Sequence, residues 1–441
     1  TQSHCMSTLA PANTLTDRLT VFANQLAGDP LEAMRRSGAA DFARLGLPHT
    51  ELEDWKYTNF KGLQQLDALA PLPILDEAAI DLNKYRIAGI DAYELVFING
   101  RFAGTLSSRF ESEKRFISSL ALARNLRTGL LLEHLGMYAQ QQNEGLTALN
   151  TALAPDGFVI HLSKNEVCER PVVVYHISTG TKERGWVNQR NLVVAEAGSQ
   201  LTLIEKYISD SPIFDNVVTE VVVGSNADVA HYKLQTRYGD AWHVGTTRVE
   251  QSRDSRYYNA TISWSGELVR NNLQTRHNGT GCETHYFGLY LLDHDNLIDN
   301  HTLVDHAQPH CNSHELYKGI VGPAGKAVFN GKVMVRPDAQ KTDAYQSNAN
   351  ILLADSGTIN TKPELEIFAD DVKCSHGATI GQLDLNELFY LKARGIGEEK
   401  ARTILLTAFA GEVIEAIRID ALREDLLGQL MAELQRMQIT F

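Results

Sequence analysis

Cys374 and His376 are the two residues whose types and spacing best suit chemistry. They lie in the segment Phe368-Ala-Asp-Asp-Val-Lys-Cys-Ser-His-Gly-Ala-Thr-Ile-Gly381. Alternate side chains of a strand share a face, so a strand here places the thiol and the imidazole side by side. This pair suits a soft transition metal such as iron or zinc. Two ligands do not complete a site, so a metal would need further ligands from elsewhere, including another chain. A structural role for both residues is the alternative.

A second group of possible ligands follows residue 300. It comprises His301, His306, His310, Cys311 and His314. A helix would align three of the histidines, but the flanking residues are typical of strands and Pro309 interrupts a helix. We therefore expect solvated histidines at corners and one buried thiol rather than a metal site.

Three aspartates provide an alternative, hydrolytic chemistry. Asp293, Asp295 and Asp299 are acid/base candidates if the chain is a β-solenoid enzyme acting on a polysaccharide. Aspartates near turns usually have a structural role, so this is the second interpretation.

The hairpin Gly395-Ile-Gly397 allows a third interpretation, a helix-hairpin-helix that binds DNA. Its backbone amides would hold a phosphate at a helix N-terminus. Glu398 and Glu399 occupy that N-terminal turn and would repel a phosphate. A packing turn between two helices is the preferred interpretation.

The elements that position these residues fall into three parts. Residues 6–154 are predicted to be mostly helical, with helices over 15–26 and 31–45 and a short strand over 93–99. Residues 155–383 are predicted to form a β core, and residues 384–441 a helical unit. In that unit, helices are expected over 385–394, around a stripe of Ile404, Leu405, Ala408 and Phe409, and over 421–438.

The β core has a regular period. Strand-like runs begin near residues 199, 227, 255, 281 and 310, and a second series begins near 216, 242, 268 and 296. The steps within each series are 26 to 29 residues. Two interleaved series with one period favour a stacked β-solenoid, with a β-sandwich of hairpins as the alternative.

Composition restricts the class of protein. The chain has 441 residues, a formal net charge of -13 and five cysteines without a Cys-x-x-Cys pair. The negative charge disfavours nucleic acid and anionic membranes as partners, and no apolar run is long enough to span a bilayer. No signal peptide is evident, and the cysteine pattern favours a reducing, cytoplasmic location. Met6 is a plausible natural start, which would make residues 1–5 extraneous.

The opening segment, followed by Leu388-Phe-Tyr-Leu-Lys-Ala-Arg-Gly-Ile396, closely resembles the C-terminal signature of the SufB/SufD family of the SUF iron–sulfur cluster assembly system. Four further segments are similar to that family: Gly325–Gly331, Gln340–Asp343, Asn348–Leu353 and Thr361–Ile367. Glu53-Asp-Trp-Lys-Tyr-Thr58 resembles its N-terminal motif. The SufD branch is the better match, because the SufB branch has acidic residues where this chain has Cys374-Ser-His376.

The resemblance implies a right-handed parallel β-helix between N- and C-terminal helical domains. It also implies a scaffold rather than an enzyme, with SufB and the ABC-type ATPase SufC as partners. SufC would dock on the C-terminal helical domain, and its ATP-driven rearrangement would open the SufB–SufD interface.

At that interface, a transient iron–sulfur cluster would use His376 as a ligand, with Cys374 as a neighbour of less certain role. No tightly bound cofactor is expected in the isolated chain. A reduced flavin is associated with the complex, although no residue here marks its site. The isolated chain could form a homodimer through the face meant for SufB.

Overall fold

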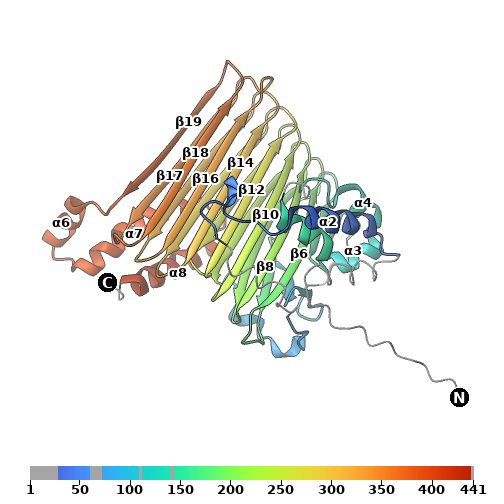
Figure 1. The fold of residues 1–441 in the computed structure, drawn as a ribbon, viewed down its shortest axis with the longest axis horizontal. Helices are drawn as coiled ribbons and strands as arrows, with labels where there is room; N and C mark the ends of the chain where they lie inside the picture. Colours follow the sequence, from blue (N-terminus) through green and yellow to red (C-terminus); the bar gives the residue numbers. More distant parts are fainter. Residues whose placement is uncertain (1–27, 60–71, 109–111, 140–143, 439–441) are drawn as a thin grey trace.

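Two β-sheets, each parallel except for one antiparallel pair at its N-terminal end, form a flattened solenoid. The computed structural model describes residues 28–59, 72–108, 112–139 and 144–438 (Figure 1). Sheet A has the strand order β18-β16-β14-β12-β10-β8-β6-β4-β3 and sheet B the order β19-β17-β15-β13-β11-β9-β7-β5-β1-β2. The chain alternates between the sheets, and each strand pairs with those one coil before and after it. The predicted solenoid is therefore confirmed, and the β-sandwich of hairpins is wrong.

From β6 onward the strands are similar in length, as a stacked coil requires, whereas β1 to β5 at the N-terminal end are shorter. Those of sheet A are β3 (Arg115–Ser119), β4 (Phe158–Leu162), β6 (Gly185–Ala195), β8 (Ile213–Val223), β10 (Ala241–Gln251), β12 (Leu268–His277), β14 (Leu297–His306), β16 (Lys326–Val335) and β18 (Thr358–Ile367). Those of sheet B are β1 (Tyr93–Ile98), β2 (Arg101–Phe102), β5 (Val172–Ser178), β7 (Gln200–Ser209), β9 (Asp228–Arg237), β11 (Arg256–Ser263), β13 (Glu283–Leu292), β15 (Asn312–Val321), β17 (Asp343–Leu352) and β19 (Lys373–Gly381).

Alternation along each strand divides the apolar residues between the lumen and the outer faces. In β15, Tyr317 belongs to the cluster that fills the lumen, whereas its neighbour Leu316 belongs to a cluster on the outer face of sheet B. The lumen is therefore a packed core. Parallel, in-register pairing places residues of one type above one another, which is how a repeated sequence pattern produces continuous side-chain columns.

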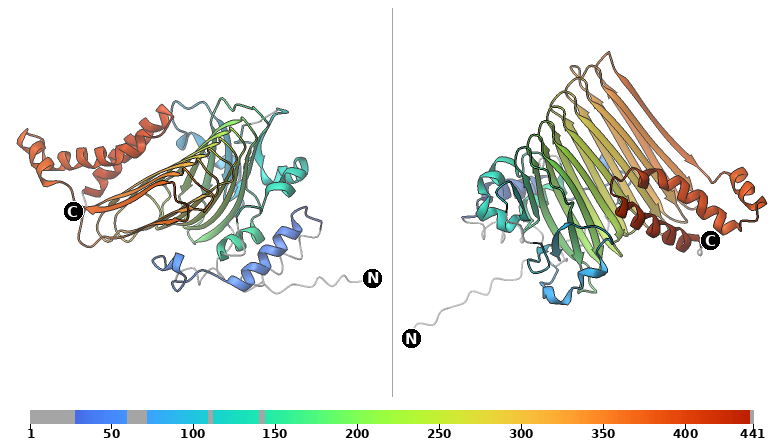
Figure 2. Two further views of the ribbon diagram at one scale, coloured as in Figure 1. Left: turned by 90° about the horizontal axis from the view of Figure 1, so that it is seen from above. Right: turned by 180° about the vertical axis from the view of Figure 1, so that it is seen from behind.

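The N-terminal end of the solenoid is covered. β3 pairs antiparallel with β4, so the sheets begin before the region predicted to be the β core. Short helices lie beside this end (Figures 1 and 2). They are α2 (Glu32–Leu45), α3 (Leu120–Leu126), α4 (Thr128–His134) and α5 (Gly145–Leu153). The helix predicted over residues 31–45 corresponds to α2, while the one predicted over 15–26 lies outside the described residues.

The segment from Glu53 to Thr58 crosses the outer face of sheet A. The 3-10 helix η1 (Glu53–Trp55) buries Trp55 under Arg270, whose guanidinium lies 3.8 Å from the ring centroid. Arg270 also donates hydrogen bonds to the Asp54 carbonyl at 2.6 Å and to the Asp299 carboxylate at 2.7 Å. Thr58 donates to the same carboxylate. This motif fixes the N-terminal region to the middle of the solenoid. Two further 3-10 helices, η3 (Glu77–Ala79) and η4 (Leu82–Lys84), precede β1.

Three helices follow β19: α6 (Leu385–Ala393), α7 (Glu398–Glu415) and α8 (Asp420–Gln438). Helices α7 and α8 lie along the outer face of sheet B, as the two views in Figure 2 show. Their buried residues include Leu406, Ala410, Val413, Leu426 and Leu430. The helices were predicted, but the stripe of Ile404, Leu405, Ala408 and Phe409 is not the buried face: Ile404 and Ala408 are exposed.

Within the described ranges, no helix is long and apolar enough to cross a membrane.

Candidate metal-ligating site

Cys374 and His376 lie on β19, the last strand of sheet B (Figure 1). Cys374 is in register with Ala344 of β17, and His376 with Gln346. Gln346 is buried in the lumen, so the register places both candidate ligands on the lumen face of the last coil. The prediction that they share one face of a strand is confirmed. No described strand pairs with the far edge of β19.

Cys374 is half-buried against apolar side chains. It packs against a cluster comprising Val333, Val335, Ala339, Ala344 and Ala369. Burial raises the pKa of its thiol, and the nearby carboxylate of Asp343 acts in the same direction. Because the thiolate is the form that binds metals, these surroundings keep Cys374 a poor ligand until they change.

His376 has different surroundings. It is exposed, because no further coil covers it. The residue beneath it in the lumen is the polar Gln346, where Cys374 has the apolar Ala344. The imidazole is therefore accessible to a second protein, and the side chain beside it on the next strand is polar.

The chain itself supplies an incomplete set of ligands. Asp371, which precedes the pair, forms an ion pair with Lys341. Across the described parts of the chain, no group of three or more His, Cys, Asp or Glu side chains is arranged to hold a metal ion. A metal held by His376 would therefore need ligands from another molecule.

The histidine-rich group does not form a second site, but the expectation of solvated corners is wrong for His301, which lies within β14 beside Asp299, and for His306. His306 is buried, and its Nδ1 lies 3.3 Å from His277 Nδ1 and its Nε2 2.9 Å from Ser313 Oγ. Burial lowers the pKa of His306 to about 4. His310 and His314 are exposed as predicted, and Cys311 is a buried thiol as predicted. Strand alternation indicates faces but does not reveal partners on the opposite sheet.

The three aspartates of the polysaccharide interpretation do not come together. Asp293 pairs with Arg436 of α8 at 3.0 Å, on the side of sheet B. Asp299 is buried with Arg270 and His301 on the outer face of sheet A, and these two side chains hold its pKa down to about 2. Asp295 is exposed in the turn between β13 and β14. The other two carboxylates have structural partners, so no acid/base pair is formed.

The Gly395-Ile-Gly397 hairpin is also occupied by its own contacts. Glu398, in the first turn of α7, accepts hydrogen bonds from Lys392 at 2.6 Å and Arg402 at 3.0 Å. The carboxylate lies where a DNA phosphate would have to bind, which favours the predicted packing turn.

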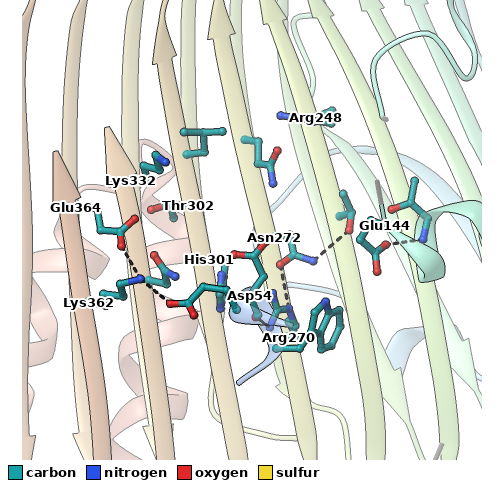
Figure 3. Close-up of a pocket in the computed structure, with 17 residues that line it drawn as sticks. Asp54, Glu144, Arg248, Arg270, Asn272, His301, Thr302, Lys332, Lys362 and Glu364 are labelled. Atoms are coloured by element: carbon teal, nitrogen blue, oxygen red, sulfur yellow. Dashed lines mark hydrogen bonds and ion pairs between the residues drawn. The ribbon is translucent and has the colours of Figure 1, made fainter. Parts of the chain in front are cut away.

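Two grooves lie outside the predicted site. The first, on the outer face of sheet A, has a volume of about 510 Å³ and is polar (Figure 3). Its cations are largely matched: Lys362 contacts Glu364 at 2.6 Å and Glu53 at 3.0 Å, and Lys332 contacts Glu366 at 2.7 Å. This groove is a mixed-charge surface with no excess of either sign.

The second groove, of about 600 Å³, runs between α7 and α8 and is more apolar. Ile404, Ala408 and Gly411 line it from α7, and Leu427 and Met431 from α8. Ile404 is 39% exposed and Met431 46% exposed. Two residues of the predicted apolar stripe, Ile404 and Ala408, thus contribute to an open surface.

Comparison with known proteins is consistent with this architecture. Residues 176–409 match the family model of the SufBD core domain of the SUF system for FeS cluster assembly, and residues 15–174 match the model of the SufBD N-terminal region. The chain is 35% identical to an iron–sulfur cluster assembly SufBD family protein of Synechocystis, over 90% of this chain and 89% of the relative. It is 30% identical to the iron–sulfur cluster assembly protein SufD of Escherichia coli, over 88% and 89% of the two chains.

Proposed function

The chain belongs to the SufBD family of iron–sulfur cluster assembly proteins, and from this premise we propose that it is a SufD-type scaffold subunit without catalytic activity of its own. The open end of the solenoid forms an interface with SufB, and His376 provides a ligand there to the nascent cluster. The cluster is cargo, assembled at the interface and then released. The observation that carries this proposal is the position of His376, exposed on the last coil with an incomplete ligand set.

The surface around His376 supports a protein partner. Four large hydrophobic residues are exposed on the last coils: Tyr345, Ile367, Phe368 and Ile380. The far edge of β19 also offers unpaired backbone groups, which a strand of another protein can complete. A related solenoid such as SufB is suited to both features. Without SufB, a second copy of this chain could pair in the same way.

His376 is better suited than Cys374 to a transient cluster. A neutral imidazole binds iron without losing a proton, whereas the half-buried thiol of Cys374 must first be deprotonated. Imidazole ligands also occur in iron–sulfur centres, where they replace thiolates. We therefore assign the ligand role to His376 and a packing role to Cys374 until the interface opens.

The test is cluster assembly in a complex reconstituted with SufB and SufC. His376→Ala should lower the yield of assembled cluster at least tenfold, measured as bound iron and sulfide, while partner binding and thermal stability stay unchanged because His376 is exposed. Cys374→Ala, in the neighbouring lumen position, should lower the yield much less. Wild-type yield from His376→Ala would exclude the ligand role.

We further propose that SufC docks on the groove between α7 and α8. A helical ATPase surface could insert apolar side chains between Ile404 and Met431. The double substitution Ile404→Glu and Met431→Glu should abolish co-purification with SufC and leave SufB binding intact. Leu385→Glu on α6, at an apolar residue that is 74% exposed and lies outside the groove, is the control and should retain SufC. Undiminished SufC binding by the double variant would place the docking surface elsewhere.

A further inference from the structure

A column of polar side chains in the lumen ends at His376. Parallel register aligns Glu315 of β15 with Gln346 of β17, and Gln346 with His376 of β19. Neighbouring strands are about 4.8 Å apart, so each side chain lies one strand spacing from the next. Glu315 and Gln346 are both buried. The column therefore places a single amide between a buried carboxyl group and the exposed imidazole.

The amide of Gln346 is held in one orientation. Its Nε2 donates a hydrogen bond to Glu315 Oε2 at 2.7 Å. Gly331 of β16 makes room for it, since a Cβ at Gly331 would lie only 2.3 Å from Gln346 Nε2. With the amino group directed at Glu315, the carbonyl oxygen is left as the free end of the amide.

That carbonyl oxygen is the unusual feature. Gln346 Oε1 is one of several buried side-chain polar atoms in the described residues that have no hydrogen-bond partner, and Glu315 Oε1 in the same column is another. Buried acceptors without a partner are rare because they are costly, so an unpaired one calls for an explanation. The next side chain in the column is an imidazole with a ring N–H to donate.

We propose that Gln346 is a positioning residue that accepts a hydrogen bond from one ring N–H of His376, and that Glu315 orients Gln346 for this purpose. The bond selects one tautomer and directs the lone pair of the other ring nitrogen out of the solenoid end. Histidines that bind metals usually donate their second ring nitrogen to such an acceptor. The role of Gln346 in cluster assembly rests on the function proposed for His376, but its effect on the tautomer does not.

The residues aligned with Cys374 on the neighbouring strands offer it no free hydrogen-bond acceptor of this kind. Ala344 lies directly beneath it and Ser313 one coil further, where the Ser313 hydroxyl is already bonded to His306. Cys374 thus has an apolar methyl group in the place where His376 has an amide. This difference indicates which of the two side chains the lumen orients.

The test measures the His376 tautomer by NMR in the full-length chain with 15N-labelled histidine, with the His376 signals identified by their loss in His376→Gln. The wild-type protein should show one protonated and one unprotonated ring nitrogen. Gln346→Met, which removes the acceptor at similar volume, should give the mixture of tautomers typical of a free imidazole. In the reconstituted complex it should lower cluster yield about tenfold, the lower end of the 10- to 100-fold loss typical of second-shell partners of metal-binding histidines.

Asn348→Leu is the matched control, because Asn348 is a buried amide on the same strand, aligned with Ala378 instead of His376. It should leave the tautomer unchanged even if it lowers stability. If Gln346→Met does not fold, Gly331→Ala displaces the same amide by steric contact and should give the same mixture. Glu315→Gln, which keeps an acceptor for Gln346, should preserve the wild-type tautomer.

Different results would exclude the positioning role of Gln346 and the ligand role of His376. An unchanged tautomer in both Gln346→Met and Gly331→Ala would overturn the positioning role. A changed tautomer with wild-type cluster yield would confirm the positioning role and exclude His376 as a ligand.

Discussion

The two ends of the solenoid are built from the same repeating unit, but one end is covered by other elements and the other end is exposed. At the N-terminal end, the edge strand β3 of sheet A has no exposed residue, whereas at the other end every residue of β19 except Cys374 is exposed. The first coils are covered by β3 and by short helices, and the last coil is left open (Figure 1). A stacked architecture requires protection of both ends, so an open end indicates that another protein supplies the cover.

The ion pairs also differ between the two ends: they are buried near the covered end and partly exposed near the open end. Near the covered end, Glu220 and Arg190 form a fully buried ion pair at 2.9 Å. Glu220 also accepts hydrogen bonds from the backbone N–H groups of Gly136, Tyr138 and Ala139, which fixes the segment after α4 to sheet A. Near the open end, the pair between Lys332 and Glu366 is partly exposed. Buried charges thus hold a loop on the sheet at the covered end, whereas the ion pair at the open end remains partly solvated.

The largest expected effect is on stability at the covered end. Glu220→Gln leaves Arg190 buried without its counter-charge, which typically costs 3–5 kcal/mol. We expect the free energy of unfolding to fall by about this amount, as measured by urea denaturation.

Glu366→Gln makes the same chemical change at the open end and is the control. Because that ion pair is partly solvated, its loss should cost less than about 1 kcal/mol. Equal losses for the two variants would contradict the distinction between a covered and an open end.

Much of the solenoid was predictable from sequence, and the reason is its regular stacking. Parallel in-register coils repeat the same turns, so the 26- to 29-residue period was visible as two strand series. The alternation rule likewise placed Cys374 and His376 on one face. Both are local or periodic properties, which a single sequence contains.

Contacts between distant parts of the chain were not predictable. Trp55 and Arg270 pack together, and Thr58 bonds to Asp299, 241 residues away. Neither pairing has a periodic signal. Whether the apolar stripe at Ile404 faces the core or an open surface was not predictable for a related reason. Helix α7 presents apolar residues on two faces, and only contact with sheet B decides which is buried.

The orientation of Gln346 was missed for a different reason. The stacking of residues 315, 346 and 376 follows from the register, but its steps of 31 and 30 residues lie outside the 26- to 29-residue period visible in the sequence. The signal available in the sequence was the placement of polar residues at lumen positions where apolar ones are expected.

A smaller effect, on association and not on stability, is expected at the open end. Phe368 is 62% exposed and Ile380 52% exposed, so the double variant Phe368→Glu and Ile380→Glu should change the free energy of unfolding by less than about 0.5 kcal/mol per site. Placing two carboxylates in an apolar contact should weaken SufB binding about 100-fold, equivalent to about 2.7 kcal/mol. Isothermal titration calorimetry with SufB measures this change.

Leu132→Glu with Met137→Glu is the matched control, since these residues are 60% and 64% exposed near the covered end. That variant adds the same charge to the chain and should bind SufB like the wild type, so any general electrostatic repulsion appears in both variants and a local contact in only one. If both variants weaken binding alike, the effect comes from total charge. If neither does, the open end is not the SufB interface, and the exposure of His376 no longer supports its role as a cluster ligand.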